Sequence, residues 1–525
     1  MASRPRRRLV QRTTNNVASL PAPVGGWNAR DALANMAPTD AVTLDNLFPG
    51  VSSVSLRGGY YNYATGMTGQ VETLAVYSAG ATDQMFAIAN GSIFNVTSGG
   101  AVGAAVVSGL TNSRWESVNV TTSGGSYMYL ANGVDAPRLY NGSTWTTITG
   151  VSTPAITGVT TTKLHAPTLF KNRLWFLEKD TLKAWYLPTS SIGGAATAFD
   201  LSAIARLGGR LVAMATWTID AGYGVDDNLV FVTDQGEVIV YRGTDPASAA
   251  TWALMGIWIL GAPVADHRGL AKYGGDLLIL TLDGLMPMAA ALQSSRLDPT
   301  VALSDKIQGA FAAATKTYQT NFGWAVLYNP LNNALIVNVP VGVGSQQQFV
   351  MNNITKAWCR FTGWPANCWA MLNSEPYFGG NGVVGKAWTA GTGANDYADN
   401  GMAITTRALQ AFNYFETRGV VKQFTRGRPT IYSNGSPAIN IGVNVDFQTA
   451  DLVGPLSFSP TSYGLWDVGL WDQAIWGSDT VVSNNLVGLQ GIGYCGAVNF
   501  NSSSKNLSLE WASTDIVYQL GWAGI

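Results

Sequence analysis

Short runs of alternating apolar and polar residues, each broken by a tight turn, recur along most of the chain. Leu229–Tyr241 shows the pattern clearly, because apolar runs lie on both sides of Asp234-Gln235-Gly236. A turn of this kind between two alternating runs is a strong short-range signal for a β-hairpin. The pattern therefore predicts a chain built mainly of short β-hairpins.

The turn centres have a regular spacing. They lie near positions 91, 142, 180, 235, 283, 332 and 381. Gaps of about 40 to 55 residues match the length of a four-stranded propeller blade. The spacing predicts an all-β fold with an irregular β-propeller of about seven blades over residues 59–395. Because the units share no strict repeat signature, a stack of irregular β-sandwiches is the alternative.

The pattern changes near residue 390, where a polar, glycine-rich connector follows. Beyond it, Ile439–Phe447 alternates strictly between apolar and polar residues, and strand-like segments continue to residue 518. Residues 396–525 are therefore predicted to form an additional C-terminal β-domain, a platform beside the propeller.

A local tryptophan repeat lies within this second domain. Trp466, Trp471 and Trp476 recur every five residues, a spacing that fits neither a strand face nor a helix face. We interpret the three indoles as plugs at a sheet end or as subunit contacts. A stacking platform for sugar rings or bases is the alternative.

Residues 1–58 are predicted to form an extended arm with one short helix. Thr39 or Asp40 can cap a helix over residues 41–46, and Phe48-Pro49-Gly50 would end it. The apolar side chains of this segment have no reason to stay ordered unless something buries them. We therefore expect Trp27, Leu44 and Phe48 to contact an adaptor protein or a neighbouring subunit.

Composition favours a member of an assembly over a free monomer. Only 12% of the 525 residues are charged, about half the average for soluble proteins, and the mean hydropathy is +0.11. The longest nearly apolar run, about residues 253–265, is shorter than the roughly 20 residues that a membrane-spanning helix needs. A weakly charged surface suits a chain that partners largely cover.

The basic residues are concentrated at the N-terminus. The first acidic residue is Asp31, and without the first twelve residues the balance of basic over acidic side chains is about −6. No apolar stretch follows the arginines, so they are not a secretion signal. Candidate contacts with DNA phosphate or with an acidic partner are Arg4, Arg6, Arg7 and Arg8. A solvated tail is the alternative.

No constellation of residues demands an active site. His165 and His267 have no second ligand at metal-binding spacing, and the chain carries no nucleophile elbow or phosphate-binding loop. Asp396 and Asp399 fit turns better than a glycosidase carboxylate pair. The sequence thus predicts no enzymatic activity and implies no metal or cofactor.

Seven motifs in this order resemble the tail nozzle (tail tubular) proteins of short-tailed, podovirus-like bacteriophages. They are Gly25–Asp31, Met36–Asp40, Leu44–Gly50, Val54–Tyr60, Asn353–Trp358, Phe378–Gly382 and Asp399–Gly401.

The resemblance implies a structural virion protein of the tail, assembled in the bacterial cytoplasm. Such a protein forms a homo-oligomeric ring, expected to be a hexamer, below the portal and the adaptor or head–tail connector proteins, beside tail fibres or spikes. Its channel retains and then ejects double-stranded DNA without sequence specificity, and a negative lumen would let the DNA slide. A glycan-binding or glycan-cleaving propeller and an unassigned scaffold are the alternatives.

Overall fold

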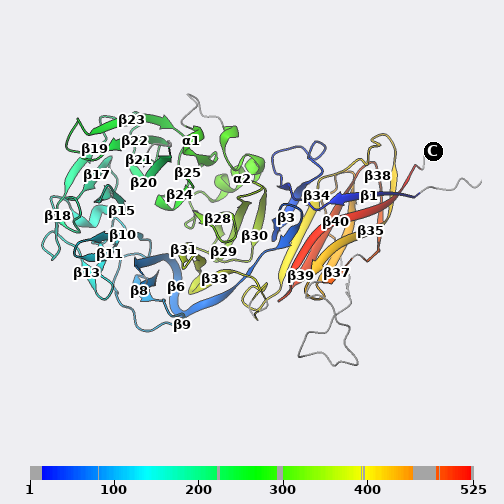
Figure 1. Cartoon of the computed structure of the whole chain (residues 1–525), viewed down its shortest axis with the longest axis horizontal. Helices are drawn as coiled ribbons and strands as arrows, with labels where there is room; N and C mark the ends of the chain where they lie inside the picture. The colour runs from blue at the N-terminus through cyan, green and yellow to red at the C-terminus, as the bar shows by residue number, and fades with distance from the viewer. Residues whose placement is uncertain are drawn as a thin grey trace, which may run out of the picture.

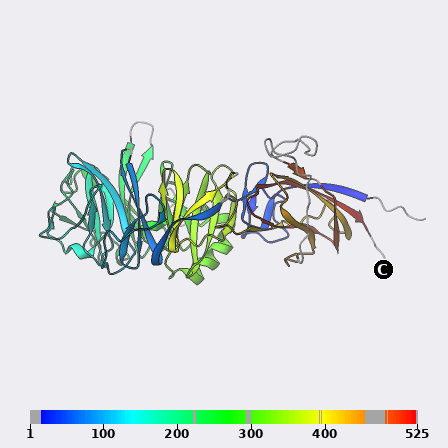
Figure 2. The same cartoon turned by 90° about the horizontal axis from the view of Figure 1, so that it is seen from below.

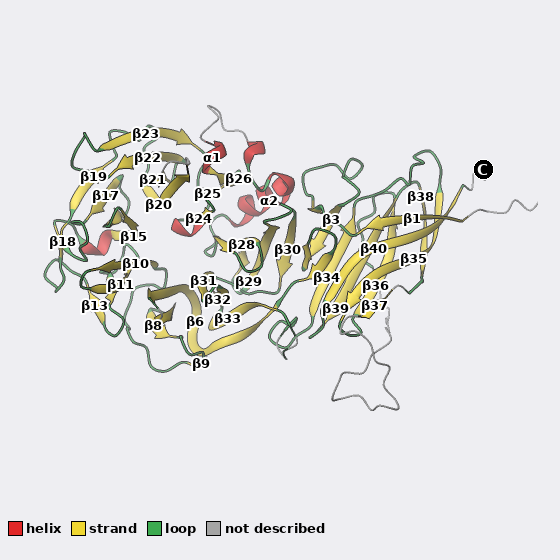
Figure 3. Cartoon of the chain, viewed as in Figure 1, coloured by secondary structure: helices red, strands yellow, loops and turns green. Residues whose placement is uncertain are grey.

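Strands make up most of the protein, and the few helices are short (Figure 3). The computed structural model describes residues 15–80, 82–220, 225–291, 299–391, 393, 396–452, 481–483 and 485–521. A ring of small sheets occupies one end of the elongated molecule and a two-layered sandwich the other (Figures 1 and 2). No helix in these ranges is long and apolar enough to cross a membrane.

The ring is a seven-bladed β-propeller, as the turn spacing predicted. Each blade is an antiparallel sheet, and its innermost strand contacts the innermost strands of both neighbouring blades around the whole circle (Figure 1). The innermost strands are β6 (Gly59–Ala79), β10 (Glu116–Thr122), β15 (Leu164–Phe170), β20 (Leu211–Asp220), β24 (Leu270–Tyr273), β27 (Ala325–Asn329) and β31 (Cys368–Leu372).

The outer strands follow the innermost strand of each blade in chain order. They are β7 (Thr82–Ala89), β8 (Ser92–Asn95), β11 (Gly125–Ala131), β12 (Arg138–Tyr140), β13 (Trp145–Thr147), β16 (Arg173–Glu178), β17 (Lys183–Tyr186), β19 (Thr197–Asp200), β21 (Val225–Thr233), β22 (Glu237–Gly243), β23 (Trp252–Ile259), β25 (Asp276–Thr281), β26 (Gly284–Pro287), β28 (Ala334–Gly342), β29 (Ser345–Asn352), β30 (Trp358–Thr362), β32 (Glu375–Gly379) and β33 (Asn381–Thr389).

Short elements fill the connections between and within blades. They are β9 (Gly100–Ala101), β14 (Ile156–Thr157), β18 (Gly194–Ala195), α1 (Met288–Ala291), α2 (Gln308–Tyr318), η1 (Thr161–Lys163), η2 (His267–Gly269), η3 (Pro299–Val301) and η4 (Asp305–Ile307).

The seven predicted turns each join two paired strands, one turn in every blade. At the first of them, Asn90 and Gly91 have φ angles of 45° and 67°. A two-residue hairpin turn of type I′ requires a positive φ at both positions, which Asn and Gly adopt most readily. The prediction of one hairpin signal per blade is confirmed.

The longest strand, β6, closes the ring. Its first half pairs with β33 and is the outermost strand of the last blade. Its second half, from Val71, pairs with β7 and is the innermost strand of the first blade. One strand therefore fastens the last blade to the first.

The sandwich is built from both ends of the chain. One layer has the order β3-β34-β39-β36, and the other contains β37-β35-β40-β5-β4 with β1 on β40 and β38 on β35. Its strands are β1 (Asn15–Pro21), β2 (Gly26–Trp27), β3 (Asp40–Asp45), β4 (Leu47–Pro49), β5 (Val54–Leu56), β34 (Ile404–Gln410), β35 (Lys422–Ser433), β36 (Ala438–Val445), β37 (Val481–Ser483), β38 (Val487–Gly493), β39 (Gly496–Ser504) and β40 (Leu509–Leu520).

The described part of residues 1–58 is not an arm with a helix. Residues 41–46 were expected to be helical, but Asp40–Asp45 is strand β3, which pairs with β34. Val42 and Thr43 are β-branched and favour a strand, and pairing there buries Leu44 completely. The predicted C-terminal domain is therefore completed by five N-terminal strands.

Propeller and sandwich meet at a buried ion pair. The Arg57 side chain is 0% exposed, lies 2.6 Å from the Asp399 carboxylate, and donates a 2.8 Å hydrogen bond to Asn46 Oδ1. Beside it, Arg360 of β30 binds Asp45 of β3 through two hydrogen bonds of 2.7 Å. These charged contacts join a blade and the sandwich.

Candidate binding site at the mouth of the propeller

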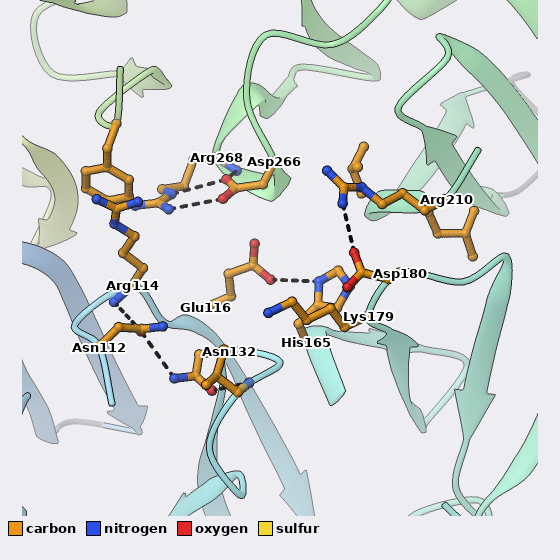
Figure 4. A pocket seen from close by; sticks show the side chains of 14 residues that line it. Asn112, Arg114, Glu116, Asn132, His165, Lys179, Asp180, Arg210, Asp266 and Arg268 are labelled. Atoms are coloured by element: carbon orange, nitrogen blue, oxygen red, sulfur yellow. Dashed lines mark hydrogen bonds and ion pairs between the residues drawn. The ribbon is translucent and has the colours of Figure 1, made fainter. Parts of the chain in front are cut away.

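A cavity of about 330 Å³ opens at the centre of the propeller, where the innermost strands begin. Glu116 is the first residue of β10, His165 the second of β15 and Leu211 the first of β20. Because successive innermost strands run in the same direction along the propeller axis, their first residues meet at one rim. The lining is Asn112, Arg114, Glu116, Asn132, Val134, His165, Lys179, Asp180, Arg210, Leu211, Val212, Asp266, Arg268 and Phe322 (Figure 4).

Two arginines on one side of this mouth lie against a single aromatic ring. The guanidinium carbons of Arg114 and Arg268 are each 4.2 Å from the centroid of Phe322, a cation–π distance. Arg268 also donates two hydrogen bonds to the Asp266 carboxylate, and Arg114 Nε donates one of 3.1 Å to Glu72. The contacts hold both guanidinium groups in place.

Glu116 is a buried carboxyl at the wall of the mouth. It accepts a 2.6 Å hydrogen bond from the Ala166 backbone N–H and lies 4.0 Å from His165 Nδ1. Burial, together with the nearby negative charge of Asp266, raises the pKa of Glu116. Burial lowers the pKa of His165 to about 4. Both side chains are therefore held toward their uncharged forms.

Asp266 behaves in the opposite way from Glu116. Burial acts to raise its pKa, but the charge of Arg268 and the hydrogen bonds from Arg268 outweigh burial and lower it. The contact with Arg268 therefore favours the ionised form of Asp266, whereas burial favours the neutral form of Glu116.

The far side of the mouth carries another ion pair and one unpaired cation. Arg210 Nη1 donates a 2.8 Å hydrogen bond to Asp180, and its Nε lies 3.5 Å from Asp234. The Lys179 ammonium group has no ion-pair or hydrogen-bond partner among the described residues. Four basic side chains thus line the cavity with three acidic ones, and two of these, Asp180 and Asp266, are paired with arginines.

The sequence analysis named two histidines of this region but assigned them no binding role. His165 and His267 were noted, and both lie at or next to the mouth; His267 Nδ1 is 3.1 Å from the Met214 carbonyl oxygen. Glu116, Asp266 and Arg268 were not singled out. The signal they share is their place in the chain, because Glu116 begins the innermost strand β10 and Asp266 and Arg268 lie just before the innermost strand β24.

The N-terminal residues that were expected to contact a partner protein pack against this chain itself. Trp27 is 8% exposed and Leu44 is 0% exposed, both within the core of this chain. Phe48 is half-buried and packs edge-on against Phe361 and Trp388. Propeller strands and the sandwich strand β34 of the same chain thus supply the burial that was expected from a partner.

Other candidate residues fall outside the described ranges or have structural roles. Those outside are Trp466, Trp471, Trp476, Arg4, Arg6, Arg7 and Arg8. Asp399 binds Arg57, and Asp396 accepts a 2.8 Å hydrogen bond from the Gly393 backbone N–H. Both carboxylates therefore make local structural contacts.

No protein-family model and no curated protein sequence matches the chain. It is similar to BBS1N in complex with ARL6DN (TM-score 0.39, 10% identity, 64% of this chain and 98% of that chain). It is also similar to a chain of the mitotic checkpoint complex (0.36, 8%, 63% and 95%) and to Chaetomium thermophilum Raptor (0.40, 11%, 65% and 29%). At these scores the likeness adds nothing to the propeller that the sheet order establishes.

Proposed function

We propose that this chain is a structural subunit of the tail nozzle of a short-tailed bacteriophage. The observation that carries the proposal is that motifs behind the resemblance, up to 342 residues apart in the sequence, contact one another in the fold. Arg57 binds Asp399, and the Tyr60 and Phe378 rings lie 5.2 Å apart.

A third contact joins two further motifs. Gly26 has φ +82°, and a Cβ there would lie 2.6 Å from the Trp358 carbonyl oxygen, so the position requires glycine. When motifs pack against one another, a change in one motif limits which residues the other can carry. The contacts therefore support treating the ordered motifs as one family signature.

An uncharged outer edge also supports a subunit role. β23 is the outermost strand of its blade, and Leu254, Met255 and Ile259 are 42%, 50% and 53% exposed on it. Residues 252–265 contain no charged side chain. Free monomers usually protect such an edge with charges or proline, so the exposed edge is what a chain covered by partners would have.

The proposed role is mechanical and not enzymatic. A ring of these chains, expected to have six members, would lie in the virion tail below the portal and adaptor and next to fibres or spikes. It would guide the genome during ejection, and the negative balance of the chain beyond its N-terminus would keep DNA phosphate from adhering.

The test is the mass of the purified full chain, alone and with its candidate adaptor protein, followed by negative-stain imaging. The expected result is a ring of about six chains with a hole wide enough for a DNA duplex. A chain that stays monomeric beside every candidate tail partner would contradict the proposal.

We propose glycan binding as a second function, because of the cavity at the mouth of the propeller. Its volume of about 330 Å³ falls within the range of small-ligand sites, about 300–1,000 Å³. Amide, carboxyl and guanidinium groups line it together with an aromatic ring. Titration of the full chain with mono- and oligosaccharides tests this function, and a chain that binds none of them would contradict it.

A further inference from the structure

The mouth cavity has more free hydrogen-bond donors than acceptors. Only Nε of the Arg114 guanidinium group has a side-chain partner, and Lys179 has none among the described residues. Lys179 is one of the side chains that line the cavity (Figure 4). Donors of this kind favour a ligand rich in acceptor oxygens.

The acceptors that could repel a negative ligand are already neutralised. Asp180 binds Arg210, and Asp266 binds Arg268. Glu116 is held toward its neutral form by burial. The lining therefore keeps a positive balance, and Lys179 is the cation that no carboxylate compensates.

The cavity is large enough for a ligand with an organic body. Its volume of about 330 Å³ lies in the range of small-ligand sites, and a second cavity of about 200 Å³ shares Arg114, Arg268 and Phe322 with it. Val134 and Leu211 supply apolar wall, while Asn112 and Asn132 supply amide groups. This mixture suits a hydroxylated ring with one apolar face.

We propose that the mouth binds an acidic sugar residue, a pyranose-sized ring whose carboxylate pairs with Lys179. The proposal rests on the second function above and names its substrate class.

The experiment is calorimetric titration of the full chain with glucuronate, glucose and inorganic phosphate. Glucuronate is expected to bind at least tenfold more tightly than glucose, which corresponds to about 1.4 kcal/mol, and phosphate should not displace it. Lys179→Gln should reduce glucuronate affinity to about that of glucose. The matched control is Lys183→Gln, which removes a lysine of β17 that pairs with Asp200 of β19. It should change neither the glucuronate affinity nor the glucose affinity.

Three results would overturn the proposal. If glucuronate and glucose bind equally in the parent chain and in Lys179→Gln, the acidic-sugar inference fails while glycan binding stands. If phosphate displaces glucuronate, the site recognises any oxyanion. If no sugar binds, both proposals fail together. Equal thermal melting of the two variants and the parent checks that folding is unaffected.

Discussion

At the residue scale, Arg57 is the most constrained side chain at the junction. Its guanidinium group is 0% exposed and is compensated by Asp399, which is 15% exposed. A charge in such a place is tolerated only with a charged partner and further hydrogen bonds, and the Asn46 side chain and the Gly58 and Thr362 carbonyl oxygens supply the bonds. The junction therefore depends strongly on one carboxylate.

Asp399→Asn should lower the free energy of unfolding by about 3 kcal/mol, because it leaves the buried Arg57 charge uncompensated. Denaturant unfolding followed by tryptophan fluorescence measures the loss. The control is Asp515→Asn, since Asp515 pairs with Arg428, whose side chain is 51% exposed, and exposed pairs contribute up to about 1 kcal/mol. Equal losses of unfolding free energy in the two variants would show that the buried junction pair stabilises the fold no more than an exposed pair does.

His165 should make stability fall in mild acid. Its pKa is lowered to about 4 in the folded chain, against about 6.5 when unfolded. Below pH 6.5 the unfolded chain therefore binds a proton at His165 that the folded chain does not bind. The free energy of unfolding falls as the pH falls from about 6.5 to about 4.

His165→Gln should reduce this loss, as seen in melting temperatures measured between pH 7.5 and pH 4. Part of the dependence should persist, because burial also lowers the pKa of His267. An unchanged pH profile in the variant would contradict the assignment.

The mouth could not be predicted from the sequence for a physical reason. Glu116, His165 and Asp266 are adjacent only because three separate blades bring their first strands to one rim. Turn chemistry locates hairpins within a blade but contains no information about which side chains meet across blades. Local sequence rules therefore found the blades and missed the site.

At the element scale, turns were predictable and one helix was not. Asn-Gly and Asp-Gly pairs favour a tight turn through their own backbone conformation, so the turn can be predicted without knowing the tertiary structure. Residues 41–46 have a cap residue and no strong periodicity, and pairing with β34 decides their conformation. The pairing partner lies more than 360 residues away, beyond the reach of a local pattern.

The hairpin between β7 and β8 provides a test of turn chemistry. Gly91→Ala should destabilise the chain by about 3 kcal/mol, because alanine is strained at φ +67° and its Cβ would collide with the Leu110 carbonyl oxygen. Gly109→Ala is the matched control, with φ +74° and open space around it. Its expected cost is about 1 kcal/mol, and denaturant unfolding compares the two. Equal costs would show that the collision is relieved.

The edge strand β23 should make the isolated chain self-associate. Replacing Met255 and Ile259 together with lysine adds charge to an exposed apolar edge and should reduce association at high protein concentration. Sedimentation velocity measures the effect. Ala249→Lys adds a charge at an exposed position just before the strand and should leave association nearly unchanged. If both variants associate like the parent, β23 is not the contact.

At the scale of the whole molecule, the blade number was predictable and the closure was not. Spacing between turns counts the units, but it does not show that β6 serves two blades or that β1 pairs with β40. Asn15 lies opposite Gln519 in that pair. Contacts over such separations are set by the global topology, which short-range patterns do not encode.

The path of the chain makes the propeller an insertion. The strands before Gly59 and those after Thr389 belong to the sandwich, and the Tyr60 N–H donates a hydrogen bond to the Ala398 carbonyl oxygen, so entry and exit lie side by side. Beside this entry and exit, β3 of the sandwich pairs with β30 of the sixth blade, so the two parts share one continuous sheet. The propeller is therefore an insertion that is hydrogen-bonded to its host, and it cannot swing freely about the two connecting segments.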